Sequence, residues 1–154
     1  MKNTELREFV ERTINKDVIN LSDEDFNGLY NKWFEGEKSD NYTFSRDTIR
    51  ETQNIPDNAY MLGVDLPYWF GDFDKSSKKI MIVGIDPLRN KGAFKAANAD
   101  VNKNVLISSP YALHSKELRE GKLKTYWALI KKLQTNNFIY LTDVYKSFFL
   151  LEVD

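Results

Sequence analysis

The residues best placed to do chemistry follow an apolar run at residues 80–83 and read Gly84-Ile85-Asp86-Pro87. A glycine lets a ligand or another backbone approach closely, and a proline keeps the residue before it extended, so Asp86 is expected to point in a fixed direction. A carboxylate at a strand end can order a water nucleophile, stabilise a developing cation or bind a metal. The alternative is that Asp86 caps the next helix or pairs with a nearby cation.

A loop rich in cations follows this turn. Between residues 87 and 99 the only charged side chains are Arg89, Lys91 and Lys95. The wider segment 75–134 carries 13 Lys/Arg and 4 Asp/Glu, a net charge of +9, whereas residues 1–74 carry 8 Lys/Arg and 16 Asp/Glu, a net charge of -8. Because Lys and Arg neutralise phosphates, the basic segment suits a phosphate-bearing partner. Alternatively, the acidic part of the chain folds over it.

A second acid follows another apolar run in the same manner. Residues 138–141 are apolar, and Asp143 comes two residues later. If the two strands are parallel, Asp143 lies on the same sheet edge as Asp86, where ligands of open α/β sheets bind. Two such acids suit an acid/base pair or a Mg²⁺ site, as a phosphoesterase would use. Alternatively, Asp143 is a solvated helix cap.

The elements that must position these acids predict an α/β fold. Residues 80–83, 104–107 and 138–141 are predicted strands, the first of them covered on both faces because its apolar run is uninterrupted. Between the last two strands an apolar stripe at helical spacing runs over residues 123–133. This order predicts a three-layer α/β/α sandwich with a partly parallel central sheet, preceded by a helical N-terminal region.

The N-terminal portion, residues 1–58, is predicted to be helical. Apolar spacing indicates helices at residues 4–16 and 22–36, and a short one around residues 46–52. Residues 59–76 hold four aromatic side chains between Pro67 and Asp74 at irregular spacing, and we expect an ordered loop there that fills the edge of the core. The alternative is a platform on which bases stack. With 154 residues the chain fits one domain, divided into this portion and an α/β portion at 59–154.

Composition narrows the classes of function. The chain has no cysteine and a single histidine, His114, so we expect no disulfide, no thiolate chemistry and no metal or other cofactor. The N-terminus alternates charges where a signal peptide would be apolar, and no stretch approaches a membrane span of about 20 apolar residues. We therefore expect a cytoplasmic protein without a membrane partner. Its oligomeric state is left open.

Taken together, these motifs resemble those of the uracil-DNA glycosylase superfamily, over roughly residues 66–150. In that family a buried strand ends in Gly-x-Asp-Pro or Gly-x-Asn-Pro, matched here by residues 84–87. Ser109-Pro110-Tyr111 and the aromatic segment 125–130 are similar to a later proline and an aromatic-Trp helix start. The Leu141–Tyr145 segment looks like the strand end at which the family carries a base-reading Asn.

The resemblance implies a role for each matching residue. Asp86 would position the water that attacks the sugar C1′ and would stabilise the oxocarbenium-like transition state. Arg89, Lys91 and Lys95 would hold the DNA backbone, while the target nucleotide is flipped into a pocket. The remaining candidates would surround the flipped base, with Tyr111 as the stacking aromatic: Gly84, Ile85, Pro87, Leu88, Tyr111 and Asp143.

The sequence departs from the family pattern in three ways. Leu88 stands where the best-known members have Tyr, which shields the pyrimidine 5-position. Asp143 replaces the reading Asn, and an ionised Asp offers no donor to the O4 of uracil. The family's His-Pro-Ser-like loop has no counterpart among the 154 residues, because His114 comes too early. The resemblance therefore implies a divergent or partial glycosylase acting on DNA, or a non-catalytic member of the fold that binds nucleic acid, a nucleotide or a protein.

Overall fold

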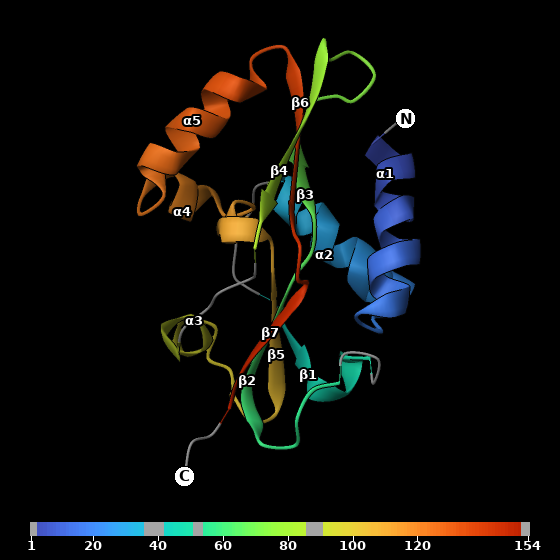
Figure 1. The fold of residues 1–154 in the computed structure, drawn as a ribbon, viewed down its shortest axis with the longest axis vertical. Coiled ribbons are helices and arrows are strands. Elements are labelled where there is room, and N and C mark those ends of the chain that lie inside the picture. The colour runs from blue at the N-terminus through green and yellow to red at the C-terminus, as the bar shows by residue number, and fades with distance from the viewer. Residues whose placement is uncertain (1–2, 36–41, 51–53, 86–90, 152–154) are drawn as a thin grey trace.

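Two mixed β-sheets with helices on both sides make up the fold (Figure 1). The computed structural model describes residues 3–35, 42–50, 54–85 and 91–151. Its helices and helical turns are α1 (Asn3–Val10), η1 (Glu11–Asn15), α2 (Asp23–Glu35), η2 (Arg46–Thr48), α3 (Lys91–Ala96), η4 (Pro110–Ala112), α4 (Lys116–Glu120) and α5 (Lys124–Gln134). Its strands are β1 (Tyr42–Ser45), β2 (Ala59–Asp65), β3 (Tyr68–Phe70), β4 (Lys78–Gly84), β5 (Asn104–Ser108), β6 (Asn137–Asp143) and β7 (Ser147–Leu151).

The strands divide into a sheet of order β1-β5-β2-β7 and a sheet of order β3-β6-β4. β2 pairs with β5 and β4 pairs with β6 in parallel, and the other pairs are antiparallel. The α/β class and the three strands expected from the sequence are thus confirmed. The expectation of one central sheet is corrected, because β5 lies in a different sheet from β4 and β6. The chain passes between the sheets four times, from β2 to β3, from β4 to β5, from β5 to β6 and from β6 to β7.

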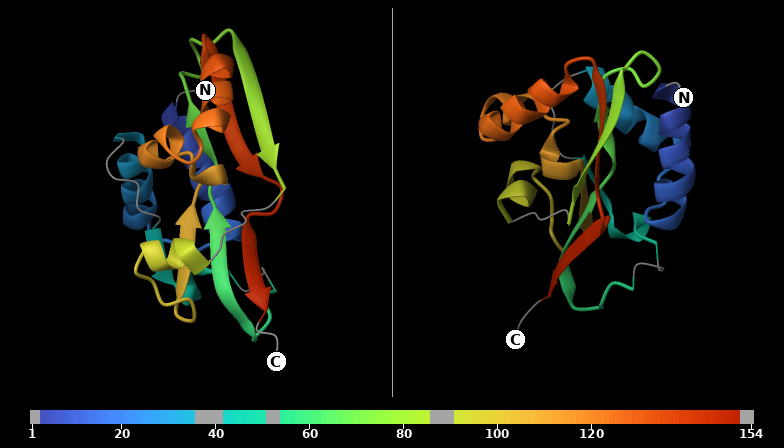
Figure 2. Two further views of the ribbon diagram at one scale, coloured as in Figure 1. Left: turned by 90° about the vertical axis from the view of Figure 1, so that its left-hand side faces the viewer. Right: turned by 45° about the horizontal axis from the view of Figure 1, so that its top comes forward.

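Helices cover both faces of this layer of strands, as the sequence predicted. α1 and α2 lie on one side, and α3, α4 and α5 lie on the other (Figures 1 and 2). α2 begins where the Ser22 Oγ accepts a hydrogen bond from the Asp25 N–H, at 3.1 Å, and three acids in its first turn suit the helix dipole. α5 buries Ile130 and packs Trp127 against Phe70 of β3. The expected helix around residues 46–52 is only the short turn η2, and residues 51–53 lie outside the described residues.

The aromatic segment 59–76 forms strands β2 and β3 rather than the expected loop. Tyr68 and Trp69 are buried core side chains, so they do not offer bases a surface for stacking. The Tyr30 hydroxyl donates to the Pro67 carbonyl at 2.6 Å, and the Tyr68 hydroxyl donates to the Trp33 carbonyl at 3.2 Å. These hydrogen bonds tie α2 to the crossing between the two sheets.

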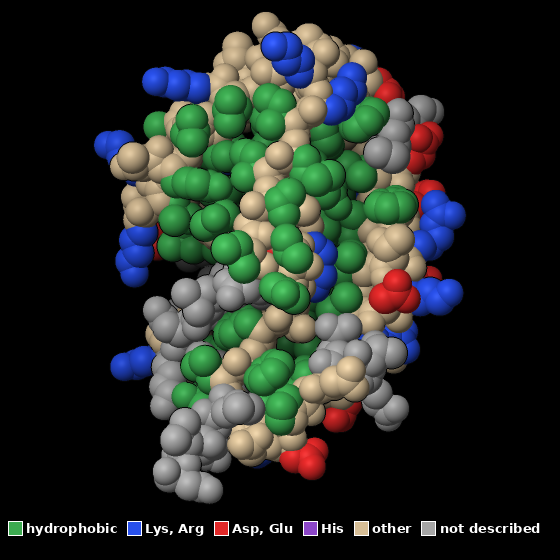
Figure 3. All heavy atoms as spheres, viewed as in Figure 1, with side chains coloured by type: hydrophobic (Ala, Val, Ile, Leu, Met, Phe, Trp, Pro, Cys, Tyr) green, Lys and Arg blue, Asp and Glu red, His purple; other side chains and the backbone are tan. Residues whose placement is uncertain are grey.

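β4 is an edge strand, and only one of its faces is covered. Met81 is 63% exposed and Val83 is 50% exposed, whereas Ile80 and Ile82 pack against the core. The expectation that both faces are covered is therefore wrong for β4, and it fits β2 better. Figure 3 shows hydrophobic side chains gathered over this side of the molecule.

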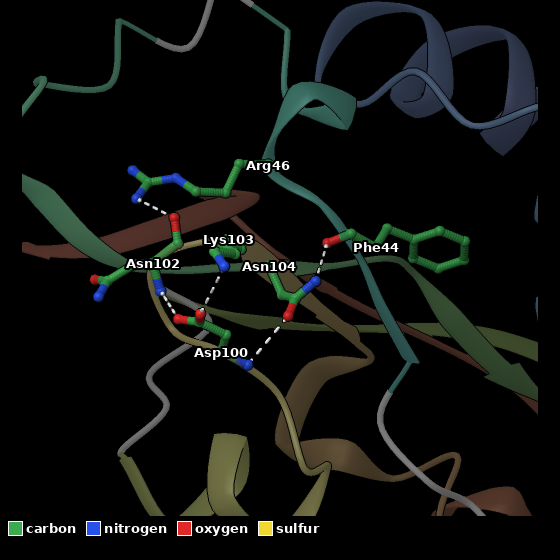
Figure 4. Close-up of polar contacts among 6 residues, drawn as sticks. All are labelled: Phe44, Arg46, Asp100, Asn102, Lys103 and Asn104. Atoms are coloured by element: carbon green, nitrogen blue, oxygen red, sulfur yellow. Dashed lines mark hydrogen bonds and ion pairs between the residues drawn. The ribbon is translucent and has the colours of Figure 1, made fainter.

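A turn stabilised by side chains fixes the start of β5 (Figure 4). The Asp100 N–H donates to Asn104 Oδ1 at 3.1 Å, and the Asn102 N–H donates to Asp100 Oδ1 at 2.9 Å. Arg46 Nη1 donates to the Asn102 carbonyl at 3.2 Å, which joins this turn to η2. These hydrogen bonds therefore fix the position at which β5 begins beside η2.

Among the described residues, no helix is long and apolar enough to cross a membrane.

Buried tyrosines predict that the protein loses stability in alkali. Burial raises the pKa of Tyr140 from 10.0 to about 12, and burial also raises the pKa of Tyr30 and Tyr68. The folded state then binds more protons than the unfolded state between about pH 10 and 12, so stability falls across this window. Tyr140→Phe should remove up to about 3 kcal/mol of this loss. Urea unfolding at pH 8 and pH 11.5 measures it, and equal pH dependence in both proteins would contradict it.

Candidate functional site

The carboxyl ends of both parallel strand pairs meet at the middle of the molecule. β2 and β5 run toward the ends of β4 and β6, which run in the opposite direction (Figure 2). In register, Asp65 pairs with Ser108 and Gly84 pairs with Asp143. Backbone hydrogen bonds continue beyond the strands, since the Asp65 N–H donates to the Lys146 carbonyl at 2.9 Å. Ligands of α/β sheets bind beyond such ends, so this junction is the candidate site.

Gly84 lies at the centre of this junction. A β-carbon at Gly84 would overlap Asp143 Oδ1 and would lie 3.8 Å from Tyr111 Cε2. The absence of a side chain therefore makes room for the Asp143 carboxylate against the backbone of β4. The structure thus brings together three residues that the sequence selected independently, from β4, β6 and the segment after β5.

Tyr111 is held in a strained backbone conformation. Its φ is +56° and its ψ is 16°, and Ala112 has a φ of +52°. Left-handed conformations cost non-glycine residues on the order of 1–3 kcal/mol and are concentrated at functional sites. In this conformation the Tyr111 side chain is 46% exposed. The centroid of its ring lies 4.6 Å from the centroid of the Tyr126 ring.

Tyr126 adds a hydroxyl group to the site. Burial raises the pKa of Tyr126 to about 12, with further contributions from Tyr111 and from the negative charge of Asp143. The phenol therefore stays protonated at neutral pH and can donate a hydrogen bond. The sequence analysis placed Tyr126 in the apolar stripe at residues 123–133 and in the aromatic segment 125–130, but gave it no role in the site.

Asp65 and Lys146 are site residues that the sequence analysis missed. Asp65 is buried at the end of β2, and Asp143 is buried at the end of β6. Lys146 Nζ donates to the Asp143 carbonyl and to Thr142 Oγ1. Burial lowers the pKa of Lys146, whereas the charges of Asp143 and Asp65 act in the opposite direction. The sequence carried a signal for Asp65, since this residue also follows an apolar run and lies two residues before Pro67.

The remaining predicted residues have mixed outcomes. Ile85 is described and 75% exposed, directly beyond Gly84. Lys95 is exposed on α3, and Lys91 is the first residue of that helix. Four predicted residues lie outside the described residues, so their roles stay predictions: Asp86, Pro87, Leu88 and Arg89.

Ser109 and His114 resemble a catalytic pair but form part of the core. The Ser109 Oγ and His114 Nδ1 are 2.9 Å apart, and the His114 ring stacks on Trp33 with centroids at 4.4 Å. Ser109 is 0% exposed and His114 is 1% exposed, so both side chains are packed inside the protein. Their packing instead supports the strained turn that presents Tyr111.

Acidic and basic side chains are sorted onto opposite layers. Residues 3–35, which include α1 and α2, carry 4 Lys/Arg and 8 Asp/Glu. Residues 91–134, which include α3, α4 and α5, carry 9 Lys/Arg and 3 Asp/Glu, and these helices lie across the strands from α1 and α2 (Figure 1). The described acidic helices thus do not fold over the basic ones. The basic layer is the one that carries Tyr111 and Tyr126.

Within the described part of the chain, no group of three or more His, Cys, Asp or Glu side chains is arranged to hold a metal ion. No family model matches the sequence, and neither a curated protein nor a solved structure matches the chain.

Gly84→Ala is expected to disturb the site more than the fold. The new methyl group would displace the Asp143 carboxylate, which lies at the end of a side chain and can rotate away. We expect at least about a tenfold loss of ligand binding or turnover, with a stability loss below about 3 kcal/mol. Gly28→Ala is the matched control, because nothing lies within 4 Å of its new β-carbon. Equal effects of the two substitutions on binding would contradict this assignment.

Proposed function

We propose that this chain is a uracil-DNA glycosylase-like protein that hydrolyses the N-glycosidic bond of a base flipped out of DNA. The observation that carries the proposal is the meeting of Gly84, Asp143 and Tyr111 where parallel strands end. That juxtaposition supplies a carboxylate for the edge of a base, an aromatic ring for its face and a glycine that allows close approach.

The proposed reaction needs one further group, a carboxylate beside the sugar. Asp86 follows Ile85 in the sequence and is the candidate. Its carboxylate would orient a water molecule toward C1′, accept the proton of that water and offset the positive charge that develops on the sugar. The bond from C1′ to the base breaks, the water oxygen bonds to C1′, and the base leaves with a proton. The products are a free base and an abasic strand.

The basic layer supports DNA as the partner. Exposed lysines lie on α3 and α5, among them Lys95, Lys131 and Lys132, and these helices lie on the same side of the strands (Figure 1). The Tyr111 ring packs against Tyr126 of α5. Phosphates would bind there without sequence preference, and binding would weaken steeply as salt rises. We also propose that the protein is cytoplasmic.

A second candidate function is binding without catalysis. Asp143 favours it, because a carboxylate at the base edge does not match uracil. Such a protein would hold single-stranded nucleic acid or a nucleotide at the same junction.

Alkaline scission of labelled oligonucleotides tests the proposal. Single strands and duplexes that contain one uracil, hypoxanthine, cytosine or adenine in a thymine-rich context are incubated with the protein, with and without EDTA. We expect scission that EDTA does not affect. Salt-sensitive binding without scission would favour the second function, EDTA-sensitive cleavage would indicate a phosphoesterase, and neither scission nor binding would overturn both proposals.

A further inference from the structure

We infer that the base held at this site presents an exocyclic amino group, as cytosine and adenine do, rather than the carbonyl oxygen of uracil or hypoxanthine. The inference rests on the proposed function and names the substrate class of the same site.

The first step is the position of the Asp143 carboxylate. Asp143 is buried, and its Oδ1 lies over Gly84, beside the Tyr111 ring. β6 pairs with β4 at seven positions, which fixes the backbone of Asp143 at the strand end. A base with its face on Tyr111 would bring its edge toward this carboxylate.

The second step is the charge of that carboxylate. Lys146 Nζ donates to the Asp143 carbonyl, which places a cation beside this residue. The charges of Asp143 and Asp65 act to raise the pKa of Lys146, so the ammonium group and the Asp143 carboxylate attract each other. The Asp143 charge also contributes to the raised pKa of Tyr126. An ionised carboxylate accepts hydrogen bonds and donates none.

The third step is the match between this acceptor and the bases. Cytosine N4 and adenine N6 are donors, and acidic side chains recognise the cytosine amino group in this manner. The O4 of uracil and the O6 of hypoxanthine are hydrogen-bond acceptors. They would face the ionised carboxylate, another acceptor, and no hydrogen bond could form between the two groups. A buried acceptor pair of this kind is costly, so the keto bases are disfavoured. Each correct pairing commonly discriminates by at least about tenfold.

The test compares bases that differ at one position. Each substrate is an oligothymidylate that carries one test base, and the pairs compared are cytosine with uracil and adenine with hypoxanthine. Base release from each substrate is measured for wild type, Asp143→Asn and Asp57→Asn. Asp57 is exposed on the opposite end of β2 and controls for the loss of one negative charge. Binding to single strands of deoxycytidine and of deoxyuridine at pH 7.5 provides a readout that needs no turnover.

We expect wild type and Asp57→Asn to prefer the amino-bearing member of each pair by at least about tenfold, and Asp143→Asn to lose or reverse this preference. The same preference in binding without release would support the inference and overturn the catalytic part of the proposed function. Release of uracil as fast as cytosine by wild type would overturn the inference and leave the proposed function standing. Neither release nor binding would overturn both.

Discussion

Replacing Asp86 by asparagine is expected to lower the rate of base release by at least about a hundredfold while DNA binding is retained. General-base catalysis contributes about a hundredfold to ten-thousandfold, and electrostatic stabilisation of the transition state adds to it. Asparagine has nearly the same shape as aspartate, but it takes no proton from water and offers no charge to the sugar. Loss of a negative charge beside DNA does not weaken binding to phosphates, so affinity should stay the same or rise.

Single-turnover rates and fluorescence anisotropy separate these two effects. Asp57→Asn serves as the control for this substitution too, because it removes one charge from an exposed position just before β2, at the end of that strand opposite to Asp65. If Asp86→Asn releases a base at the wild-type rate, then Asp86 is not the catalytic carboxylate. Asp65 and Asp143, the buried acids of the same junction, would then be tested in its place.

Trp33→Ala is expected to destabilise the protein by about 3–5 kcal/mol. The Trp33 side chain is 1% exposed and is the largest of the fully buried side chains. Its ring lies edge-on to Tyr30 at 5.3 Å and to Tyr68 at 6.2 Å, and it stacks on His114 at 4.4 Å. Alanine would leave a cavity between α2, β3 and the turn after β5. Small domains have a total stability of about 5–15 kcal/mol, so a large part of it would be lost.

Urea unfolding followed by circular dichroism measures this loss. Leu129→Ala on α5 is the control, because Leu129 is 53% exposed and its truncation should change stability by less than about 1 kcal/mol. A Trp33→Ala loss as small as that of the control would contradict the packing described for α2. Trp33 stacks on His114, and His114 supports the turn that presents Tyr111. The fluorescence or mobility of Tyr111 should therefore also change in Trp33→Ala.

Periodicity and strand composition were sufficient for much of the fold. The apolar spacing and the Ser22 cap predicted α2, and the stripe at residues 123–133 predicted α5. The three apolar runs predicted β4, β5 and β6. These signals are local, because each depends only on residues that lie a few positions apart within one helix or strand.

Other features of the fold depend on distant parts of the chain. β2 and β3 lack alternation because most of their side chains are buried, so the residues 59–70 show no period of two. The assignment of β5 to a second sheet, and the exposure of one face of β4, follow from pairing over long separations. A short segment of the sequence does not specify which distant strand it pairs with.

The candidate site shows the same division. The expectation that Asp143 lies at the sheet edge where residues 80–83 end depended on parallel strands, and β4 and β6 are parallel, with Gly84 paired with Asp143. Asp65 and Lys146 join the site only because the two sheets meet end to end, which the sequence does not reveal. The roles given to Asp86 and its neighbours remain predictions.

The most direct test of the central claim is a mass balance on one oligonucleotide strand. Wild type and Asp86→Asn are each incubated with the substrate that is processed fastest, and the free base and the alkali-labile strand are quantified in the same sample. Hydrolysis of the glycosidic bond predicts equal amounts of the two products for wild type and neither for Asp86→Asn. Strand cleavage without free base, or equal release by both proteins, would contradict the account.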